Sequence, residues 1–233
     1  MNIKSISRKL LLAGLTAVAG FGLSSCSTTP GGITGSGLST YQSFDLPATL
    51  PSNPSNVRVK VSLSKQVVYV LEGSKPLLVM PVSIGKASTP TPKGNFKIYN
   101  KEAKRRANTH GYAYSGNQIK QTRLSNKPAG WGFKGTPMPY WCEFKPAYGF
   151  HTGWLKHAPA THGCIRMHEN LAPKFFRLVS NGTPVNISNS QPEDATLGRN
   201  VPRPIDAGPL PDYPASFMLN GGYYSQHKTP SFN

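Results

Sequence analysis

The chain has 233 residues, and its 26 lysines and arginines far outnumber its 9 aspartates and glutamates, which gives a formal net charge of +17 at pH 7. This length admits one ordinary domain with tails, or at most two small domains. Three cysteines are too few for a disulfide framework. The excess of cations predicts anionic partners and says nothing about the fold.

Residues 1–25 have the pattern of a bacterial secretion signal, with a cationic start and an apolar run over 10–23 that is too short to span a membrane comfortably. Residues 23–26 resemble a lipobox, which predicts cleavage before Cys26 and lipidation of its thiol. Ordinary signal-peptidase cleavage nearby, with Cys26 incidental, is the alternative. We therefore expect an exported protein, lipid-anchored through Cys26 at a bacterial membrane and facing the cell wall on the periplasmic side. Ser27 favours the outer membrane.

An exported chain seldom meets nucleic acid, so no nucleic-acid partner is expected. Anionic glycan polymers, peptide-stem carboxylates and lipid headgroups suit the charge and the compartment better. The densest cationic run is interpreted either as a substrate-steering patch or as a solvated turn face. It consists of Lys101, Lys104, Arg105 and Arg106.

Residues 26–56, rich in Gly, Ser, Thr and Pro, are expected to form a flexible tether. Residues 57–63 alternate strictly between apolar and polar side chains, which is typical of a half-buried strand. Short strands separated by turns favour a mainly antiparallel sheet over a parallel βαβ array. The further strands are predicted at 66–71, 77–84, 95–99, 140–144, 149–151 and 185–187.

The remaining segments are less regular. Residues 101–135 are polar and basic, with no readable secondary structure, and their position suits a loop or short hairpin over a cleft. Apolar residues within 169–180 have the spacing of a short amphipathic helix, with Asn170 as its cap. Residues 189–233 are expected to form a Pro/Gly-rich extended tail. An apolar patch within this tail, at 217–219 and 223–224, is suited to docking on the domain.

Cys164, within residues 161–167, carries most of the chemical information in the chain. A thiol becomes a strong nucleophile as the thiolate, which a histidine and amide donors stabilise. His151 lies thirteen residues before Cys164, and its titration range suits proton exchange with a thiol. Gly163 permits the close backbone approach that an oxyanion hole requires. The pattern predicts Cys164 as nucleophile and His151 as general base and later acid; structural roles for both are the alternative.

These residues resemble the signature of the L,D-transpeptidases, also called YkuD-type domains. The resemblance implies a mainly β catalytic domain over residues 57–188, a β-sandwich or barrel-like sheet with one or two short helices. It rests on His151-Thr152-Gly153, Thr161-His162-Gly163-Cys164-Ile165-Arg166, Ser83-Ile84-Gly85-Lys86, Thr91-Pro92-Lys93-Gly94-Asn95-Phe96, Met138-Pro139-Tyr140-Trp141 and Gly182-Thr183-Pro184-Val185-Asn186-Ile187.

The resemblance also implies roles for individual residues. The main chain of Thr152 orients the imidazole of His151 in place of a triad carboxylate, and the amides of Gly163 and Cys164 form the oxyanion hole. Arg166 stands where the family has Arg or Asn. It either holds a substrate carboxylate bidentately or fixes the turn by bonding loop carbonyls.

Four further residues have two interpretations each. His162 either lines the substrate pocket or braces the turn that presents Cys164. Tyr140 and Trp141 either form an apolar wall of the acyl-donor pocket or belong to the core. Cys142 is expected to be a small buried hydrophobe in a strand, and a redox bridge to Cys164 is its alternative.

By resemblance, the reaction is acyl transfer on peptidoglycan stem peptides. Cys164 attacks the L-centre carbonyl of the third stem residue, the terminal D-amino acid leaves, and an amine takes the acyl group to give a 3-3 cross-link. No cofactor is expected, and the spacings among the histidines and Cys164 do not match zinc patterns, so no metal is expected either. Two alternatives stay open: an L,D-carboxypeptidase or hydrolase that passes the same acyl-enzyme to water, and a non-catalytic wall-binding lipoprotein.

Overall fold

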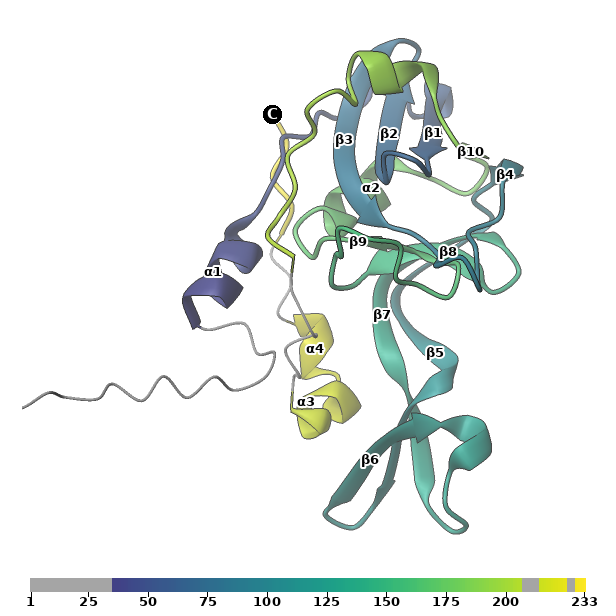
Figure 1. Ribbon diagram of the computed structural model, residues 1–233, viewed down its shortest axis with the longest axis vertical. Helices are drawn as coiled ribbons and strands as arrows, with labels where there is room; N and C mark the ends of the chain where they lie inside the picture. Colours follow the sequence, from purple (N-terminus) through teal and green to yellow (C-terminus); the bar gives the residue numbers. More distant parts are fainter. Residues whose placement is uncertain (1–34, 207–213, 226–228) are drawn as a thin grey trace, which may run out of the picture. The chain divides into compact units, whose positions relative to one another are not determined.

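Figure 1 shows the computed structural model, which describes residues 35–206, 214–225 and 229–233. Ten strands follow one another in a continuous sheet in the order β4-β10-β1-β2-β3-β9-β8-β7-β5-β6. They are β1 (Val57–Ser62), β2 (Val67–Glu72), β3 (Lys75–Ser83), β4 (Gly94–Lys97), β5 (Asn100–Ser115), β6 (Gln118–Arg123), β7 (Gly132–Lys145), β8 (Tyr148–Thr152), β9 (Ile165–Met167) and β10 (Pro184–Ser188).

The described residues also form four short α-helices, where one or two were expected. They are α1 (Gly35–Ser43), α2 (Ala172–Leu178), α3 (Ala215–Asn220) and α4 (Gly222–Ser225), with 3₁₀ turns at Pro54–Asn56, Leu124–Asn126 and Pro192–Ala195. The mainly β fold class is confirmed. None of the helices in the described ranges is long and apolar enough to cross a membrane. The predicted signal peptide and the lipidation of Cys26 lie outside these ranges.

Alternation in the sequence accounts for β1, in which Val57, Val59 and Val61 are buried and Arg58 is exposed. Strand β1 pairs antiparallel with β2 and parallel with β10. The only other parallel pair in the named strands is β8 with β9, and the remaining pairs are antiparallel. The prediction of a mainly antiparallel sheet is confirmed.

Helix α2 closes the main apolar core with Phe175, whose ring centroid lies 4.6 Å from that of Phe150. The helix is shorter than the 169–180 expected, and its N-cap, Leu171, makes no side-chain capping bond. Asn170 does not cap the helix. Its amide instead donates to the carbonyls of Gln42 and Phe44, so it ties the N-terminal segment to the domain.

The flexible tether expected over 26–56 is wrong for residues 35–56, which pack on the domain. Tyr41 is only 1% exposed, and Phe44 and Leu46 contact the main core. The ammonium of Lys174 lies 2.8 Å from the Asp45 carboxylate. These apolar anchors, spaced among small polar residues, offset the entropy of ordering the segment.

The C-terminal tail is likewise packed rather than extended in the parts that the structure describes. Asp194 accepts hydrogen bonds from the Tyr69 hydroxyl at 2.7 Å and from the Ser62 hydroxyl at 2.8 Å. The amide of Gln191 donates to the carbonyl of Val61. These hydrogen bonds to buried partners stabilise the packed position of the first part of the tail, which has few apolar side chains of its own.

Residues 101–135, unreadable from the sequence, form most of an arm of three strands, β5, β6 and β7 (Figure 1). The two long strands approach closely at Gly111, where a side chain would collide with the Lys134 carbonyl. A register shift between Arg106 and Gly111 marks the same place. The extended arm could not be recognised because a bulge and small residues break the period of two.

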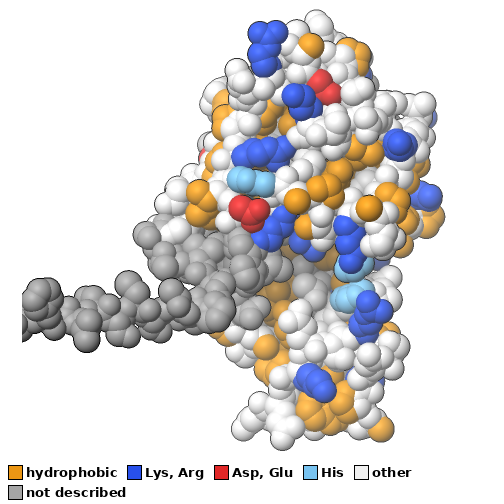
Figure 2. Space-filling view, viewed as in Figure 1, with side chains coloured by type: hydrophobic (Ala, Val, Ile, Leu, Met, Phe, Trp, Pro, Cys, Tyr) orange, Lys and Arg blue, Asp and Glu red, His pale blue; other side chains and the backbone are white. Residues whose placement is uncertain are grey.

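The densest cationic run is largely engaged within the fold, which neither sequence interpretation anticipated. Lys101 donates to the carbonyls of Phe176 and Val179, and Arg105 pairs with Glu102 at 2.7 Å. Figure 2 shows Lys and Arg side chains distributed over the visible face, with few acidic ones among them.

Candidate active site

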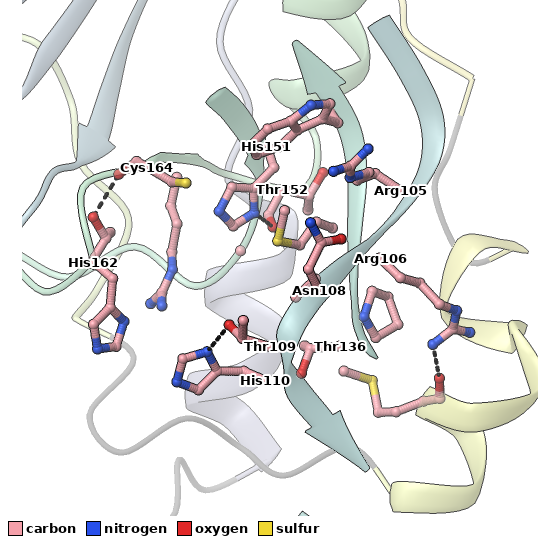
Figure 3. A pocket seen from close by; sticks show the side chains of 18 of the residues that line it. Arg105, Arg106, Asn108, Thr109, His110, Thr136, His151, Thr152, His162 and Cys164 are labelled. Atoms are coloured by element: carbon pink, nitrogen blue, oxygen red, sulfur yellow. Dashed lines mark hydrogen bonds between the residues drawn. The ribbon is translucent and has the colours of Figure 1, made fainter. Parts of the chain in front are cut away.

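Cys164 and His151 come from adjacent parallel strands. Phe150 of β8 pairs with Ile165 of β9, and His151 pairs with Arg166. Neighbouring strands lie about 4.8 Å apart, so this register brings Cys164, which immediately precedes β9, close to His151. Both residues line one cavity of about 500 Å³. Figure 3 shows the thiol of Cys164 and the imidazole of His151 facing one another in it.

The imidazole of His151 is fixed by its neighbour in the chain. Its Nδ1 lies 2.8 Å from the Thr152 carbonyl oxygen, which can only accept a hydrogen bond. Nδ1 therefore carries the proton, and Nε2 is left as the acceptor. Burial, and then the charge of Arg166, lower the pKa of His151 to about 4, so the ring is neutral near pH 7. The main-chain orienter predicted for this histidine is present.

Cys164 has a raised pKa, chiefly because its thiol is buried. A hydrogen bond from the Gly149 amide and the charge of Arg166 act in the opposite direction. Its Sγ lies 3.7 Å from the Ala147 carbonyl, to which the thiol donates. Both shifts favour the uncharged forms, so the resting site holds a neutral thiol beside a neutral imidazole.

A short turn presents the nucleophile. The Thr161 hydroxyl donates to the Cys164 carbonyl at 2.6 Å and accepts from the Gly163 amide at 3.1 Å. Thr91 donates to the Gly163 carbonyl at 3.0 Å. Gly163 has φ of +108°, and a Cβ there would lie 2.5 Å from the ring of Tyr148, so only glycine fits. Because its amide is engaged by Thr161, the oxyanion-hole role of Gly163 stays a prediction.

Arg166 lines the cavity. Of its two expected roles, holding a substrate carboxylate suits this position better than fixing the turn. Its guanidinium makes no hydrogen bond to any residue in the described ranges, so bonding of loop carbonyls has no support there. Its side chain packs against Gly153, where an added Cβ would lie 2.9 Å from Arg166 Cδ. A half-buried cation facing a cavity is suited to a ligand carboxylate.

His162 is exposed at the rim of the same cavity. Its ring stacks on His110 of β5, with centroids 5.4 Å apart and an interplanar angle of 26°. Partial burial and the charge of Lys86 lower its pKa. The structure therefore places His162 at the cavity rather than beneath the turn.

The two aromatic residues predicted at the site, Tyr140 and Trp141, have different surroundings. Trp141 lines the cavity, and its ring centroid lies 6.1 Å from that of His151. Tyr140 does not line it; its ring packs on Phe176 of α2 at 5.5 Å. Tyr140 has φ of +57°, so the regular alternation of side chains along β7 is broken at this residue, and Trp141 reaches the cavity while Tyr140 does not. Of the two interpretations, the core one suits the position of Tyr140 and the cavity-wall one suits that of Trp141.

Several residues at the site were not found from the sequence. Glu143 accepts hydrogen bonds from the Trp141 indole at 3.3 Å and the Ala147 amide at 3.1 Å, and so fixes the turn beside Cys164. The only sequence signal for this role was the position of the Glu143 carboxylate, four residues before Ala147 in the turn. Met218 and Tyr223 of the C-terminal region also line the cavity. Nothing in their sequence links them to the site.

Cys142 is fully buried, and burial raises the pKa of its thiol to about 12. It is a free thiol, as is Cys164, so no bridge joins them in this structure. Within the described ranges, no group of three or more His, Cys, Asp or Glu side chains is arranged to hold a metal ion. The Thr152 hydroxyl is buried against the cavity and has no hydrogen-bond partner among the residues that the structure describes, which makes it available to a ligand.

The chain is similar to known proteins over the region that contains these residues. A model of the L,D-transpeptidase catalytic domain family, YkuD, matches residues 56–187. The Bacillus licheniformis protein YkuD, whose name assigns it to the L,D-transpeptidases, is 26% identical over 157 residues, 67% of this chain and 81% of that protein.

Two solved structures align with part of the chain. An L,D-transpeptidase of Stackebrandtia nassauensis aligns with a TM-score of 0.44 and 22% identity over 66% of this chain and 65% of that chain. One of Mycobacterium smegmatis aligns with a TM-score of 0.44 and 21% identity over 57% and 58%. This chain thus spans less than two thirds of those chains. Because the family model matches more than half of its residues, the chain belongs to the L,D-transpeptidase catalytic domain family.

Proposed function

We propose that the protein is a peptidoglycan L,D-transpeptidase in which Cys164 is the nucleophile and His151 the general base and acid. The observation that carries the proposal is the cavity shared by the two side chains, with His151 Nδ1 bonded to the Thr152 carbonyl. That bond leaves Nε2 as the only imidazole atom able to accept a proton. Membership of the family supplies the class of substrate, peptidoglycan stem peptides.

In the first half-reaction, Cys164 Sγ attacks the carbonyl carbon of the third stem residue while its proton passes to His151 Nε2. The tetrahedral intermediate collapses, the C–N bond to the terminal D-amino acid breaks, and His151 returns the proton to the departing amine. In the second half-reaction an amine of another stem attacks the thioester and loses its proton to His151. The amide forms, the C–S bond breaks, and Cys164 recovers its proton.

The neutral resting pair suits this sequence of steps. A histidine whose pKa is about 4 is unprotonated near pH 7 and ready to accept the thiol proton. Arg166 would then hold a carboxylate of the donor stem, and the Thr152 hydroxyl would bond a peptide group beside it. Trp141 supplies an apolar wall that keeps the imidazole away from bulk water.

We also infer that the protein is exported and lipid-anchored through Cys26 at the membrane, so that the catalytic domain faces the wall. The cationic start, the apolar run and the residues that precede Cys26 support this. Growth with a radiolabelled fatty acid tests it, because only the protein with Cys26 intact should carry label. Equal labelling of a Cys26→Ala variant would contradict the inference.

The enzymatic proposal is tested with residues 27–233, which keep the packed N-terminal segment, incubated with purified disaccharide-tetrapeptides. Mass spectrometry follows loss of the terminal D-alanine and formation of dimers. The proposal predicts dimers that disappear in Cys164→Ala and persist in Cys142→Ala, a matched control that removes the other thiol. Tripeptide monomers alone would mean that water is the acceptor. No Cys164-dependent change would favour a binding lipoprotein instead.

A further inference from the structure

The C-terminal helical segment, residues 214–225, packs on the arm next to the candidate active site. Met218 and Tyr223 form an apolar cluster with Tyr112 of β5, and all three are buried. Partly buried residues surround this cluster on both sides, namely Ile119 from the arm and Ala215, Phe217 and Leu219 from the segment. The packing therefore joins two regions that are about a hundred residues apart in the chain.

Arg106 of β5 anchors the segment. Its Nη1 donates to the carbonyl of Met218 at 2.9 Å (Figure 3). Nη1 also donates to the carbonyl of Gly135 at 2.8 Å, and Nη2 donates to that of Leu219 at 3.3 Å. Its guanidinium also lies 5.4 Å from the ring centroid of Tyr224. The last carbonyls of a helix have no partner within it, so a charged donor here stabilises the docked position.

The segment reaches the chemistry as well as the arm. Met218 and Tyr223 line the same cavity as Cys164 and His151. Arg166 lines that cavity too, so the segment borders the same space as the side chain proposed to hold a substrate carboxylate. One side of the cavity is thus built from residues beyond the stretch that matches the family model, which ends at 187.

We propose that residues 214–225 are a specificity wall of the active site, with Met218 and Tyr223 contacting the acyl acceptor and Arg106 as the positioning residue. This inference rests on the proposed transpeptidase function. An acceptor amine on a hydrocarbon chain can bury its methylene groups against Met218 and Tyr223, whereas water gains nothing there. By excluding solvent from the thioester, the wall favours aminolysis over hydrolysis.

The test compares Arg106→Ala, which removes the anchor, and Met218→Ala, which enlarges the cavity without removing the anchor. Lys120→Ala is the control, since it removes one cation from an exposed position on the same arm. Circular dichroism first establishes that each variant is folded, and Met218→Ala keeps the inference testable if Arg106→Ala is not. Two properties are measured in residues 27–233.

The first is the labelling rate of Cys164 by a bulky maleimide relative to iodoacetamide, located by peptide mass spectrometry. We expect this ratio to rise about tenfold in Arg106→Ala. Loss of the charged hydrogen bonds should shift the equilibrium between docked and undocked segment by about that factor. The second is the ratio of dimer to tripeptide product, which should fall in both cavity variants while D-alanine release continues. Lys120→Ala should match the unaltered protein in both.

An unchanged labelling ratio in Arg106→Ala and Met218→Ala would overturn the inference, since the segment would then not bound the cavity. A raised labelling ratio with an unchanged product ratio would overturn it too, because the wall would not select the acceptor. Absence of dimers from the unaltered protein would instead refute the proposed function. The labelling measurement does not depend on turnover, so the two failures are distinguishable.

Discussion

Replacing Gly163 by alanine tests the geometry of the turn that presents Cys164. The backbone there has φ of +108°, and an added Cβ would lie 2.5 Å from Tyr148 Cε1 and 3.3 Å from the Pro90 carbonyl oxygen. The strained backbone costs about 1–3 kcal/mol. The overlap with the ring costs about as much again, so the free energy of unfolding should fall by about 2–6 kcal/mol.

Gly182→Ala is the matched control, because Gly182 has φ of +94° but nothing within 4 Å of the added Cβ. It should lose only the backbone contribution, about 1–3 kcal/mol. Urea denaturation measures both variants, and intact-protein mass spectrometry measures acylation by a disaccharide-tetrapeptide. We expect acylation of Gly163→Ala to fall about a hundredfold, since a shift of about 1 Å at a nucleophile has that effect.

A double-mutant cycle with Tyr148→Ala separates the collision from the backbone strain. Without the ring, Gly163→Ala should cost no more than Gly182→Ala, because the overlapping atoms are gone. The reasoning is refuted if Gly163→Ala is no more destabilising than Gly182→Ala. It is also refuted if acylation is unchanged, since the turn would then tolerate movement at Cys164.

Three further outcomes are expected. The pKa of His151 and that of His168 are each lowered to about 4, so the folded protein binds fewer protons than the unfolded chain in this pH range. The free energy of unfolding should therefore fall as pH drops from about 6.5 to 4. A free energy of unfolding in urea that does not change over this range would contradict the prediction. The raised pKa of Cys164 predicts that iodoacetamide labelling of this thiol still increases above pH 9, without a plateau near neutrality. Glu143→Gln should leave the fold unchanged and slow acylation about tenfold, since a hydrogen bond to a charged group is worth about 1.5–3 kcal/mol. An unaltered acylation rate would show that the turn keeps its conformation without the Glu143 carboxylate. Tyr41→Ala should lower the free energy of unfolding by about 3–5 kcal/mol and Tyr41→Phe by about 1 kcal/mol, whereas a neutral Tyr41→Ala would restore the tether interpretation for this segment.

Local pattern was sufficient for the parts of the fold where one period persists. The alternation around Val59 predicted β1, and the spacing of Phe175 and Leu178 predicted α2, because buried faces impose those periods. The tether prediction failed for the opposite reason. Tyr41 and Phe44 are apolar anchors too widely spaced, among small polar residues, to form a recognisable period.

The candidate site divides in the same way. Cys164 and His151 were identified because reactive residue types and glycine cluster in one short stretch, which the β8–β9 register then folds together. The orientation of Tyr140 depends on an irregularity of β7, where its φ is +57°, and a period of two in the sequence does not reveal such a break. The contribution of Met218 depends on docking against a distant arm. The apolar patch at 217–219 and 223–224 predicted that this segment docks on the domain, but no local signal encodes where it docks.

The proposed function requires that Cys164 carries the acyl group. The most direct measurement is acid-quenched mass spectrometry of residues 27–233 after brief exposure to a disaccharide-tetrapeptide, followed by peptide mapping. We expect the mass of the Cys164 peptide to increase by the mass of the substrate minus that of free D-alanine. This adduct should be absent in Cys164→Ala and slow to form in His151→Ala. D-alanine release that persists in Cys164→Ala, or an adduct on another residue, would contradict it.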